Sequence, residues 1–270
     1  MLTLARKEFR VKMEKITAHI VNWLNTYCEQ NKMDGFVVGI SGGIDSALTS
    51  TLCALTNKPV LCLNMPILQH KAEYDRANEH IEWLTSKYEN VAFVETDLTP
   101  VFKQIQETLP NTIQDPLSMA NTRARLRMLT LYAYAGNKKM LVTGTGNKVE
   151  DFGIGFFTKY GDGGVDISPI ADLLKSEVYA CAKQLGVCDS ILKAAPTDGL
   201  WDKEGTDEDQ IGASYDELEW AMKYIESGKQ NELSERQKTV LNIYARFNTS
   251  NKHKMTTIPI CKIPLELKYA

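Results

Sequence analysis

The sequence predicts an α/β protein built on a parallel, doubly wound sheet flanked by helices. Up to residue 185, short apolar segments alternate with longer segments of helical period. The short segments are apolar along almost their whole length, as in strands covered by helices on both faces. A glycine-rich turn, Gly39–Ser46, lies between the first strand and the next helix. The 270 residues suffice for one large domain of this kind.

The expected elements follow one another in a regular order. An amphipathic helix is predicted over residues 4–30, where Ile16, Ile20, Trp23 and Leu24 recur at helical spacing. Residues 34–200 are then expected to form an α/β core, and residues 201–270 a helical C-terminal part. The acidic stretch 202–209 is predicted to be a solvated loop. Strands are predicted at 36–40, 60–65, 91–94 and 140–143, and helices at 46–55, 71–87, 100–108, 118–135, 174–185, 214–226 and 233–247.

Polar or glycine-containing segments fall at the carboxyl ends of the predicted strands. They are Gly39–Ser46, Met65-Pro66, Asp97 and Gly144–Gly146. Because ligands of parallel sheets bind beyond these ends, one shared site is expected. The glycine-rich stretch 144–164 is too long for an ordinary connection and is therefore predicted to be functional.

The turn Gly39–Ser46 has the properties of a phosphate-binding loop. Its adjacent glycines let the backbone approach a ligand closely, and the helix start that follows favours an anion. Ser41 and Ser46 can donate hydroxyl hydrogen bonds, and Asp45 can cap the helix or hold a metal ion. A mononucleotide P-loop would carry a lysine after its last glycine, where this chain has Ile44-Asp45-Ser46. The loop thus predicts a nucleotide site of another kind.

Composition argues against several classes of protein. A net charge of −3 provides no basic field for nucleic acid. The six cysteines include no C-x-x-C pair, which favours free thiols in a reducing cytosol over a metal cluster or a disulfide scaffold. No apolar run approaches the roughly 20 residues of a membrane span, and the first residues lack the apolar core of a signal peptide. We therefore expect a cytoplasmic protein without nucleic-acid or membrane partners.

Longer motifs identify a family resemblance. The motif Ser-Gly-Gly-x-Asp-Ser at residues 41–46 resembles the loop of the N-type ATP pyrophosphatases, which cleave ATP between its α- and β-phosphates. With the blocks 121–128, 144–150, 155–166 and 196–201 and the pair His253-Lys254, the chain resembles the ammonia-dependent NAD synthetases from about residue 10 to 260. The run Phe-Phe-Thr-Lys-Tyr-Gly-Asp-Gly-Gly, residues 156–164, is the most specific motif. The segment 152–155 is one residue longer than the common form of that family.

The resemblance implies a single NAD synthetase domain over residues 1–270, with a Rossmann-like, adenine nucleotide alpha hydrolase-like sheet and no glutaminase domain. It implies that ATP adenylates the carboxylate of deamido-NAD with release of pyrophosphate, and that ammonia then displaces AMP to give NAD. A Mg²⁺ cofactor and a homodimer with the dinucleotide site near the subunit interface are also implied. Residues 202–209 could then be a flap over the site.

The resemblance further implies roles for individual residues. Contacts with ATP are expected from Gly39, Ile40, Ser41, Gly42, Gly43, Ile44, Asp45, Ser46, Thr145, Lys175 and Thr197. Asp45 and Glu150 are expected to bind the metal, and Arg125, Lys159, Asp166, His253 and Lys254 to contact deamido-NAD. Lysine at a helix start opposes the helix dipole, so a ligand phosphate would account for Lys175.

Some residues keep two interpretations at this point. Arg123 and Arg127 flank Arg125 on one predicted helix and are typical of a solvated or salt-bridged face, with substrate contact as the alternative. Phe156 and Phe157 could fill a core or line a pocket. His70 and His80 are expected to be structural.

Three competing functions remain to be weighed. A GMP or asparagine synthetase of the same superfamily would normally carry an amidotransferase domain, for which the synthetase region leaves no room. A tRNA-thiolating enzyme would need catalytic cysteines and a basic RNA surface. A nucleotide sensor without catalysis would not need both metal carboxylates.

Overall fold

A four-stranded parallel sheet forms the centre of the protein. The computed structural model describes residues 2–194, 207–228 and 232–268. The strand order is β3-β2-β1-β4. The strands are β1 (Phe36–Gly39), β2 (Val60–Asn64), β3 (Val91–Glu95) and the short β4 (Leu141–Val142). Since the chain passes from β3 across β1 to β4, the topological switch point lies between the carboxyl ends of β1 and β4.

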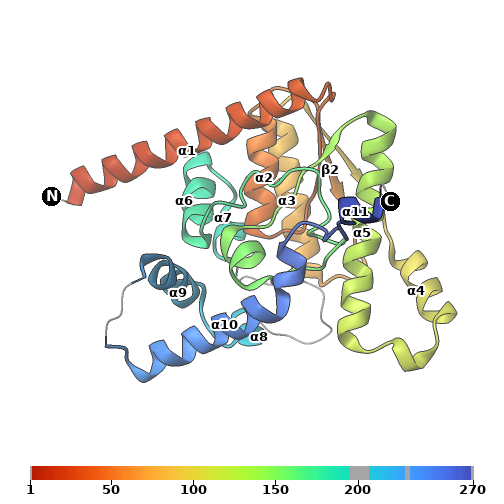
Figure 1. Ribbon diagram of the computed structural model, residues 1–270. Helices are drawn as coiled ribbons and strands as arrows, with labels where there is room; N and C mark the ends of the chain where they lie inside the picture. Colours follow the sequence, from red (N-terminus) through yellow and green to blue (C-terminus); the bar gives the residue numbers. More distant parts are fainter. Residues whose placement is uncertain (1, 195–206, 229–231, 269–270) are drawn as a thin grey trace.

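Helices cover both faces of the sheet, as the apolar strands predict (Figure 1). Alternate residues of β1 show this: Phe36 and Val38 pack into one core, and Val37 into the other. The first core is formed with α1 (Leu2–Gln30), α2 (Ile44–Ala54), α3 (Lys71–Lys87) and α6 (Lys175–Leu185). The second is formed with α4 (Thr99–Thr108) and α5 (Pro116–Lys138).

A third apolar core lies outside the sheet and joins the C-terminal helices to the segment after β4. The helices are α8 (Asp207–Ile211), α9 (Tyr215–Ser227) and α10 (Glu235–Met255). They pack against a π-helix, Lys148–Ile154, inside the stretch predicted to be a functional loop. A π-helix holds one residue more per hydrogen-bonded ring than an α-helix and is typical of functional sites.

The α/β fold and the order of its elements are confirmed, and three expectations need correction. The sequence predicted no helix at 148–154. It placed the end of the last long helix at 247, but α10 continues to Met255, so His253 and Lys254 lie on a helix. Residues 207–209 of the acidic stretch start α8, and Asp207 is buried, whereas a solvated loop was expected.

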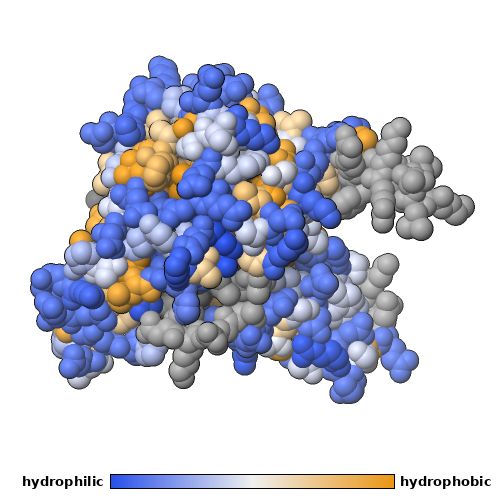
Figure 2. Space-filling model, turned by 180° about the vertical axis from the view of Figure 1, so that it is seen from behind, coloured by the Kyte–Doolittle hydropathy of each residue, from blue (hydrophilic) through white to orange (hydrophobic). Residues whose placement is uncertain are grey.

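The face seen in Figure 2 is mainly hydrophilic. On the face turned away from the viewer in Figure 1, apolar side chains gather in small patches between polar ones (Figure 2). The tail after α10 is exposed from Thr256 to Lys268 and includes the short helix α11 (Leu265–Lys268). A short 3₁₀ turn lies at Asn111–Ile113, between α4 and α5. The remaining short helix is α7 (Asp189–Leu192). Among the described residues, no helix has both the length and the apolar character needed to cross a membrane.

Candidate active site

The carboxyl ends of β1 and β4 open into a cavity of about 520 Å³. The loop Gly39–Ser46 lines one side, and Thr143–Gly146 follows β4 into it. The other side is formed by Glu150 on the π-helix, by Phe156–Thr158 and by residues of α10. The strand-end segments thus share one site as predicted, except Asp97. Its carboxylate accepts a hydrogen bond from Thr99 N (2.8 Å) at the start of α4 instead of lining the cavity.

The glycine loop is held by its own hydroxyl groups. Ser41 N donates to Ser46 Oγ (3.2 Å), Gly43 N donates to Ser41 Oγ (3.2 Å), and Ser46 Oγ donates to Gly43 O (3.0 Å). Gly42 adopts φ +82°, and a Cβ there would lie 2.5 Å from Glu73 O on α3. Only glycine fits this close approach. The N-cap of α2 is Gly43 without a side-chain bond, so Asp45 does not cap the helix and its carboxylate serves another contact.

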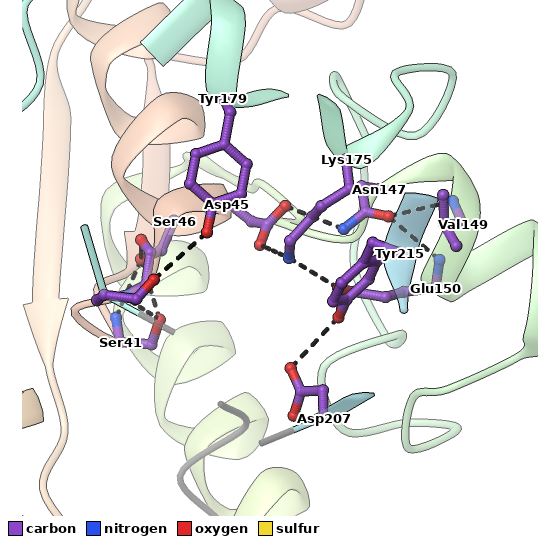
Figure 3. A network of polar contacts seen from close by, with 12 residues as sticks. Ser41, Asp45, Ser46, Asn147, Val149, Glu150, Lys175, Tyr179, Asp207 and Tyr215 are labelled. Atoms are coloured by element: carbon purple, nitrogen blue, oxygen red, sulfur yellow. Dashed lines mark hydrogen bonds and ion pairs between the residues drawn. The ribbon is translucent and has the colours of Figure 1, made fainter. Parts of the chain in front are cut away.

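That contact is with Lys175, which joins the two carboxylates predicted to bind metal. Lys175 Nζ donates to Asp45 Oδ2 at 2.7 Å and to Glu150 Oε1 at 2.8 Å (Figure 3). The lysine side chain is 5% exposed and each carboxylate side chain 17%. The ring centroid of Tyr215 lies 4.7 Å from the same nitrogen. The first residue of α6 is therefore a buried ammonium between two half-buried carboxylates.

The electrostatics of this triad are dominated by burial and by the lysine. Burial alone would lower the pKa of Lys175, but the two carboxylates outweigh it and raise that pKa far above its usual value. Burial opposes charge on Glu150, yet the lysine and the hydrogen bonds it receives lower the pKa of Glu150 below its usual value. For Asp45 burial outweighs the lysine, so the pKa is raised.

Three further side chains fix the carboxylates in place. Asn147, fully buried, donates to Asp45 Oδ1 (3.0 Å), while its Oδ1 accepts from Val149 N and Glu150 N at 3.1 Å. Tyr215 OH donates to Glu150 Oε1 (2.6 Å) and lies 3.3 Å from Asp207 Oδ2 (Figure 3). Asn147 stands within the motif 144–150, which could have indicated it. No sequence pattern marks Tyr215 or Asp207.

Two further acidic side chains, Asp151 and Asp162, line the same cavity. Protein atoms around the Asp162 carboxyl group disfavour its charged form and raise its pKa to about 6, although Thr158 N donates to it at 2.9 Å. Burial and the neighbouring Glu150 raise the pKa of Asp151 well above its usual value. Burial lowers the pKa of Lys254, whose Nζ donates to Phe157 O at 2.6 Å.

A second, more open cavity of about 680 Å³ adjoins the first. Arg125 on α5, Lys159 and Lys254 line it, together with residues 256–258 of the tail. Lys159 Nζ donates to His253 O at 3.0 Å, which ties this loop to α10. Three of the five residues predicted to contact deamido-NAD thus surround one opening.

The structure places the other predicted residues as follows. Asp166 lines neither cavity, since its carboxylate accepts from Val142 N (2.8 Å) and Tyr132 OH (3.0 Å). The exposed His253 ring also lies outside both linings, with Nδ1 3.2 Å from Ser250 O. Thr145 and Lys175 line the first cavity. Thr197 lies outside the described residues.

The structure shows where the residues that had two interpretations lie. Phe156 and Phe157 both line the first cavity, and Phe156 also packs against the third core. Arg123 is buried, with its guanidinium 5.0 Å from the Phe102 ring, so the solvated-face interpretation is wrong for it. Arg127 lines the first cavity and its Nε donates to Met65 O (3.0 Å). His80 is fully buried and structural, with Nε2 2.9 Å from Ser50 Oγ.

The fold and site define a class of protein: a nucleotide-binding α/β protein whose phosphate loop continues with Ile44-Asp45-Ser46 where a P-loop carries lysine. Residues 16–257 match the family model described as NAD synthase. The chain belongs to the NAD synthase family.

Relatives and solved structures agree with this assignment. The chain is 35% identical over 256 residues to the NH₃-dependent NAD⁺ synthetase of Methanosarcina acetivorans, covering 92% of this chain and 97% of the relative. It is 39% identical over 247 residues to that of Methanococcoides burtonii, covering 88% and 91%. The structure of NMN synthetase from Francisella tularensis matches with TM-score 0.82 and 32% identity, covering 93% of this chain and 99% of that one. NH₃-dependent NAD synthetase from Campylobacter jejuni matches with TM-score 0.76 and 28% identity over the same shares.

Proposed function

We propose that this protein is an ammonia-dependent NAD synthetase, a ligase that converts deamido-NAD, ATP and ammonia to NAD, AMP and pyrophosphate. The observation that carries the proposal is the meeting of the phosphate loop, the Asp45–Lys175–Glu150 triad and the 156–162 motif around one cavity. Curated relatives of this activity match at 34–39% identity.

In the first step, the carboxylate of the nicotinate ring attacks the α-phosphorus of ATP and pyrophosphate leaves. The loop Gly39–Ser46 offers backbone N–H groups and two hydroxyls to the leaving phosphates, next to the start of α2. Thr145 lines the same cavity, and we assign it and Thr197 to ATP binding with Lys175. Adenylation converts a poor acyl donor into one with a good leaving group.

Asp45 and Glu150 fit the needs of a magnesium ion. Their oxygens lie 2.7 and 2.8 Å from the same nitrogen, so both can reach one cation. The described residues contain no group of three or more histidine, cysteine or acidic side chains suited to a metal. Two carboxylates completed by phosphate oxygens match the way proteins hold Mg²⁺ with ATP. When bound, the ion neutralises charge on the phosphates during displacement.

In the second step, ammonia attacks the acyl carbon, AMP leaves, and the nitrogen loses a proton. We assign Arg125, Lys159 and Lys254 to the anionic groups of deamido-NAD, because they surround the opening next to the ATP cavity. Asp166 and His253 keep the role that the family resemblance gives them, although neither lines a cavity. Residues 1–270 then act as one synthetase domain, and its ammonia is either free or delivered by a separate donor protein.

We also propose that the protein works as a homodimer in the cytoplasm. Leu129 and Tyr132 on α5 and Ile258 in the tail border the second cavity and are 68%, 40% and 65% exposed. Apolar side chains concentrated at the rim of a binding site are typical of an interface. Sedimentation of the protein as a dimer would support this, and a stable monomer would contradict it.

A second candidate substrate is nicotinate mononucleotide, the acid that amidation would turn into NMN. The observation in its favour is the similarity to the NMN synthetase structure, which has a higher TM-score and identity than the Campylobacter enzyme. Both substrates carry the same reacting carboxylate. They differ in whether an adenylyl group must be bound.

One assay separates these possibilities. The protein is incubated with ATP, Mg²⁺, ammonium and either deamido-NAD or nicotinate mononucleotide, and NAD, NMN, AMP and ADP are quantified. We expect NAD and AMP in equal amounts and a higher kcat/KM with the dinucleotide. Preference for the mononucleotide would establish the second candidate, and ADP or no amide product with either acid would contradict the proposal.

Asp45→Asn tests the metal assignment. The change keeps the size of the side chain and removes its charge, so we expect a folded protein that no longer releases pyrophosphate. Retained pyrophosphate release would remove Asp45 from the metal site.

A further inference from the structure

Lys175 fills the place between the two carboxylates with a positive charge. Its ammonium has three N–H donors, and two of them point to Asp45 Oδ2 and Glu150 Oε1. The Tyr215 ring, 4.7 Å from the nitrogen, closes a further side of it. With 5% exposure, the lysine side chain cannot exchange these partners for water without leaving its site.

The partners of the carboxylates hold this arrangement from outside. Asn147 Nδ2 donates to the second oxygen of Asp45, and Tyr215 OH donates to the same oxygen of Glu150 that accepts from Lys175. The carboxylates are therefore oriented toward one point, and in the structure that point is occupied by the lysine nitrogen (Figure 3).

We propose that Lys175 acts as an internal counter-ion that excludes a divalent metal from Asp45 and Glu150 until a nucleotide draws the lysine away. This inference rests on the metal role of the two carboxylates proposed above. Two carboxylates and one ammonium carry a net charge of −1, whereas the carboxylates alone carry −2. A dication that entered beside the ammonium would meet both a smaller attraction and a like charge at close range in a poorly solvated site.

The phosphates of ATP remove this obstacle. Both Lys175 and the loop Gly39–Ser46 line the same cavity, so phosphates cradled by the loop offer the ammonium a new anionic partner. The carboxylates then face the metal that accompanies the nucleotide. Metal and nucleotide consequently bind as a unit, and the carboxylates are not left unpaired in the free protein.

The test measures Mn²⁺ binding to the free protein by electron paramagnetic resonance, with and without α,β-methylene-ATP. For the wild type we expect no binding by Mn²⁺ alone at the site and saturable binding with the analogue. For Lys175→Met without nucleotide we expect Mn²⁺ to bind at least about tenfold more tightly than to the wild type. Lys175→Arg keeps a cation and should remain closed to Mn²⁺ alone.

Two control variants locate the effect. Lys148 also lies near two carboxylates, Asp172 and Glu226, each at 3.6 Å, but on the surface. Lys148→Met should therefore leave Mn²⁺ binding as in the wild type. The double variant Asp45→Asn/Lys175→Met should lose the Mn²⁺ binding gained by the single variant, since one carboxylate of the pair is gone.

The outcomes are distinct from those of the activity assay. If wild-type protein binds Mn²⁺ without nucleotide as tightly as Lys175→Met does, the inference is wrong even though the protein forms NAD. If Lys175→Met does not fold, the wild type decides: equal Mn²⁺ affinity with and without the analogue overturns the inference, and binding that requires the analogue supports it. A protein that forms no NAD but shows these Mn²⁺ effects would contradict the proposed reaction alone.

Discussion

The two sides of the first cavity are held together in different ways. Within the loop wall, Gly39–Ser46, the hydroxyl groups of Ser41 and Ser46 make hydrogen bonds between residues at most five positions apart. Arg76 on α3 and Lys175 on α6 add distant contacts, to Gly42 O and to Asp45. The helical wall consists of the π-helix, residues 155–158 and the helices α9 and α10. Its bonds run from Tyr215 to Glu150, Asn248 to Gly153 O, Asn251 to Ile154 O and Lys254 to Phe157 O, across 65 to 97 positions.

The loop wall is mainly a local structure, whereas the helical wall depends on tertiary contacts. The loop wall needs a strand, a turn and a helix that are continuous in sequence, and its Ile40 and Ile44 are buried in the first core. The helical wall exists only when α9 and α10 pack against the π-helix in the third core. Elements held by few distant contacts open before the central sheet does. We therefore expect the helical wall to loosen first and the loop wall to persist.

The largest effect is expected from Gly42→Ala in the loop wall. The new methyl group would require a side chain at φ +82° and would lie 2.5 Å from Glu73 O and 3.1 Å from Ala77 N. Strain and overpacking together should lower the free energy of unfolding by about 4 kcal/mol. Binding of α,β-methylene-ATP should be lost. Urea unfolding and calorimetric titration measure the two effects.

Gly136→Ala is the matched control. Nothing lies within 4 Å of a Cβ at Gly136, which is inside α5. There alanine should be neutral or should stabilise by about 0.5–1 kcal/mol because it favours the helix. Equal destabilisation by both changes would show that the close approach at Gly42 is not what shapes the loop.

Gly155→Ala is the corresponding change in the helical wall, with an expected cost of about 3 kcal/mol. Gly155 ends the π-helix at φ +63°, and an added Cβ would overlap Asn251 Cβ on α10. The clash pushes α10 away from the π-helix, whereas the loop wall is untouched. We expect faster amide hydrogen exchange in α10 with unchanged exchange in α2. Loss of protection in both helices at once would mean that the two walls form a single cooperative unit.

The two walls also differ in how far the sequence predicts them. The glycine loop follows from the order strand, glycine turn, helix, which is local information, and its residues line the cavity. The last helix was predicted to end at 247 because apolar periodicity stops at Phe247. Its further turns are held by Asn248, Asn251 and Lys254, whose acceptors are backbone carbonyls far away in the chain. Polar side chains that donate to distant carbonyls leave no periodic pattern.

Lys175 shows, at a single residue, the same limit of prediction from the sequence. Its position at a helix start predicted a ligand phosphate, and α6 does begin there. The sequence could not show that the lysine contacts Asp45, 130 positions away, because only the folded chain brings α2 and α6 together. The prediction therefore found the residue and missed its partners.

A pH-dependent effect is expected from His80 beneath the loop wall. Burial lowers its pKa to about 4, and its ring meets Ser50 on α2. Below about pH 6.5 His80 is protonated in the unfolded chain, whereas in the folded chain it stays neutral down to about pH 4. The free energy of unfolding therefore falls as the pH falls. We expect a loss of about 2 kcal/mol between about pH 7.5 and about pH 5.

His80→Gln keeps a polar partner for Ser50 and removes this titration, so its stability should fall less over the same range. The exposed His70 at the start of α3 provides the comparison, and His70→Gln should keep the wild-type pH dependence. Urea unfolding at a series of pH values measures both. Identical slopes for wild type and His80→Gln would assign the acid sensitivity to other groups.

The smallest effect is expected from Arg236→Ala in the helical wall. Arg236 on α10 pairs with Glu217 on α9 at 2.6 Å, and the guanidinium lowers the pKa of Glu217 to about 2. Both side chains are substantially exposed, so the pair should contribute only about 0.5 kcal/mol, and less in high salt.

Lys238→Ala removes a pair with Glu235 that lies within α10 and should change stability even less. If Arg236→Ala instead costs as much as Gly155→Ala, surface charge rather than the buried contacts of the third core would hold α9 to α10. The helical wall would then weaken with ionic strength, whereas the hydroxyl and amide hydrogen bonds inside the loop wall would not.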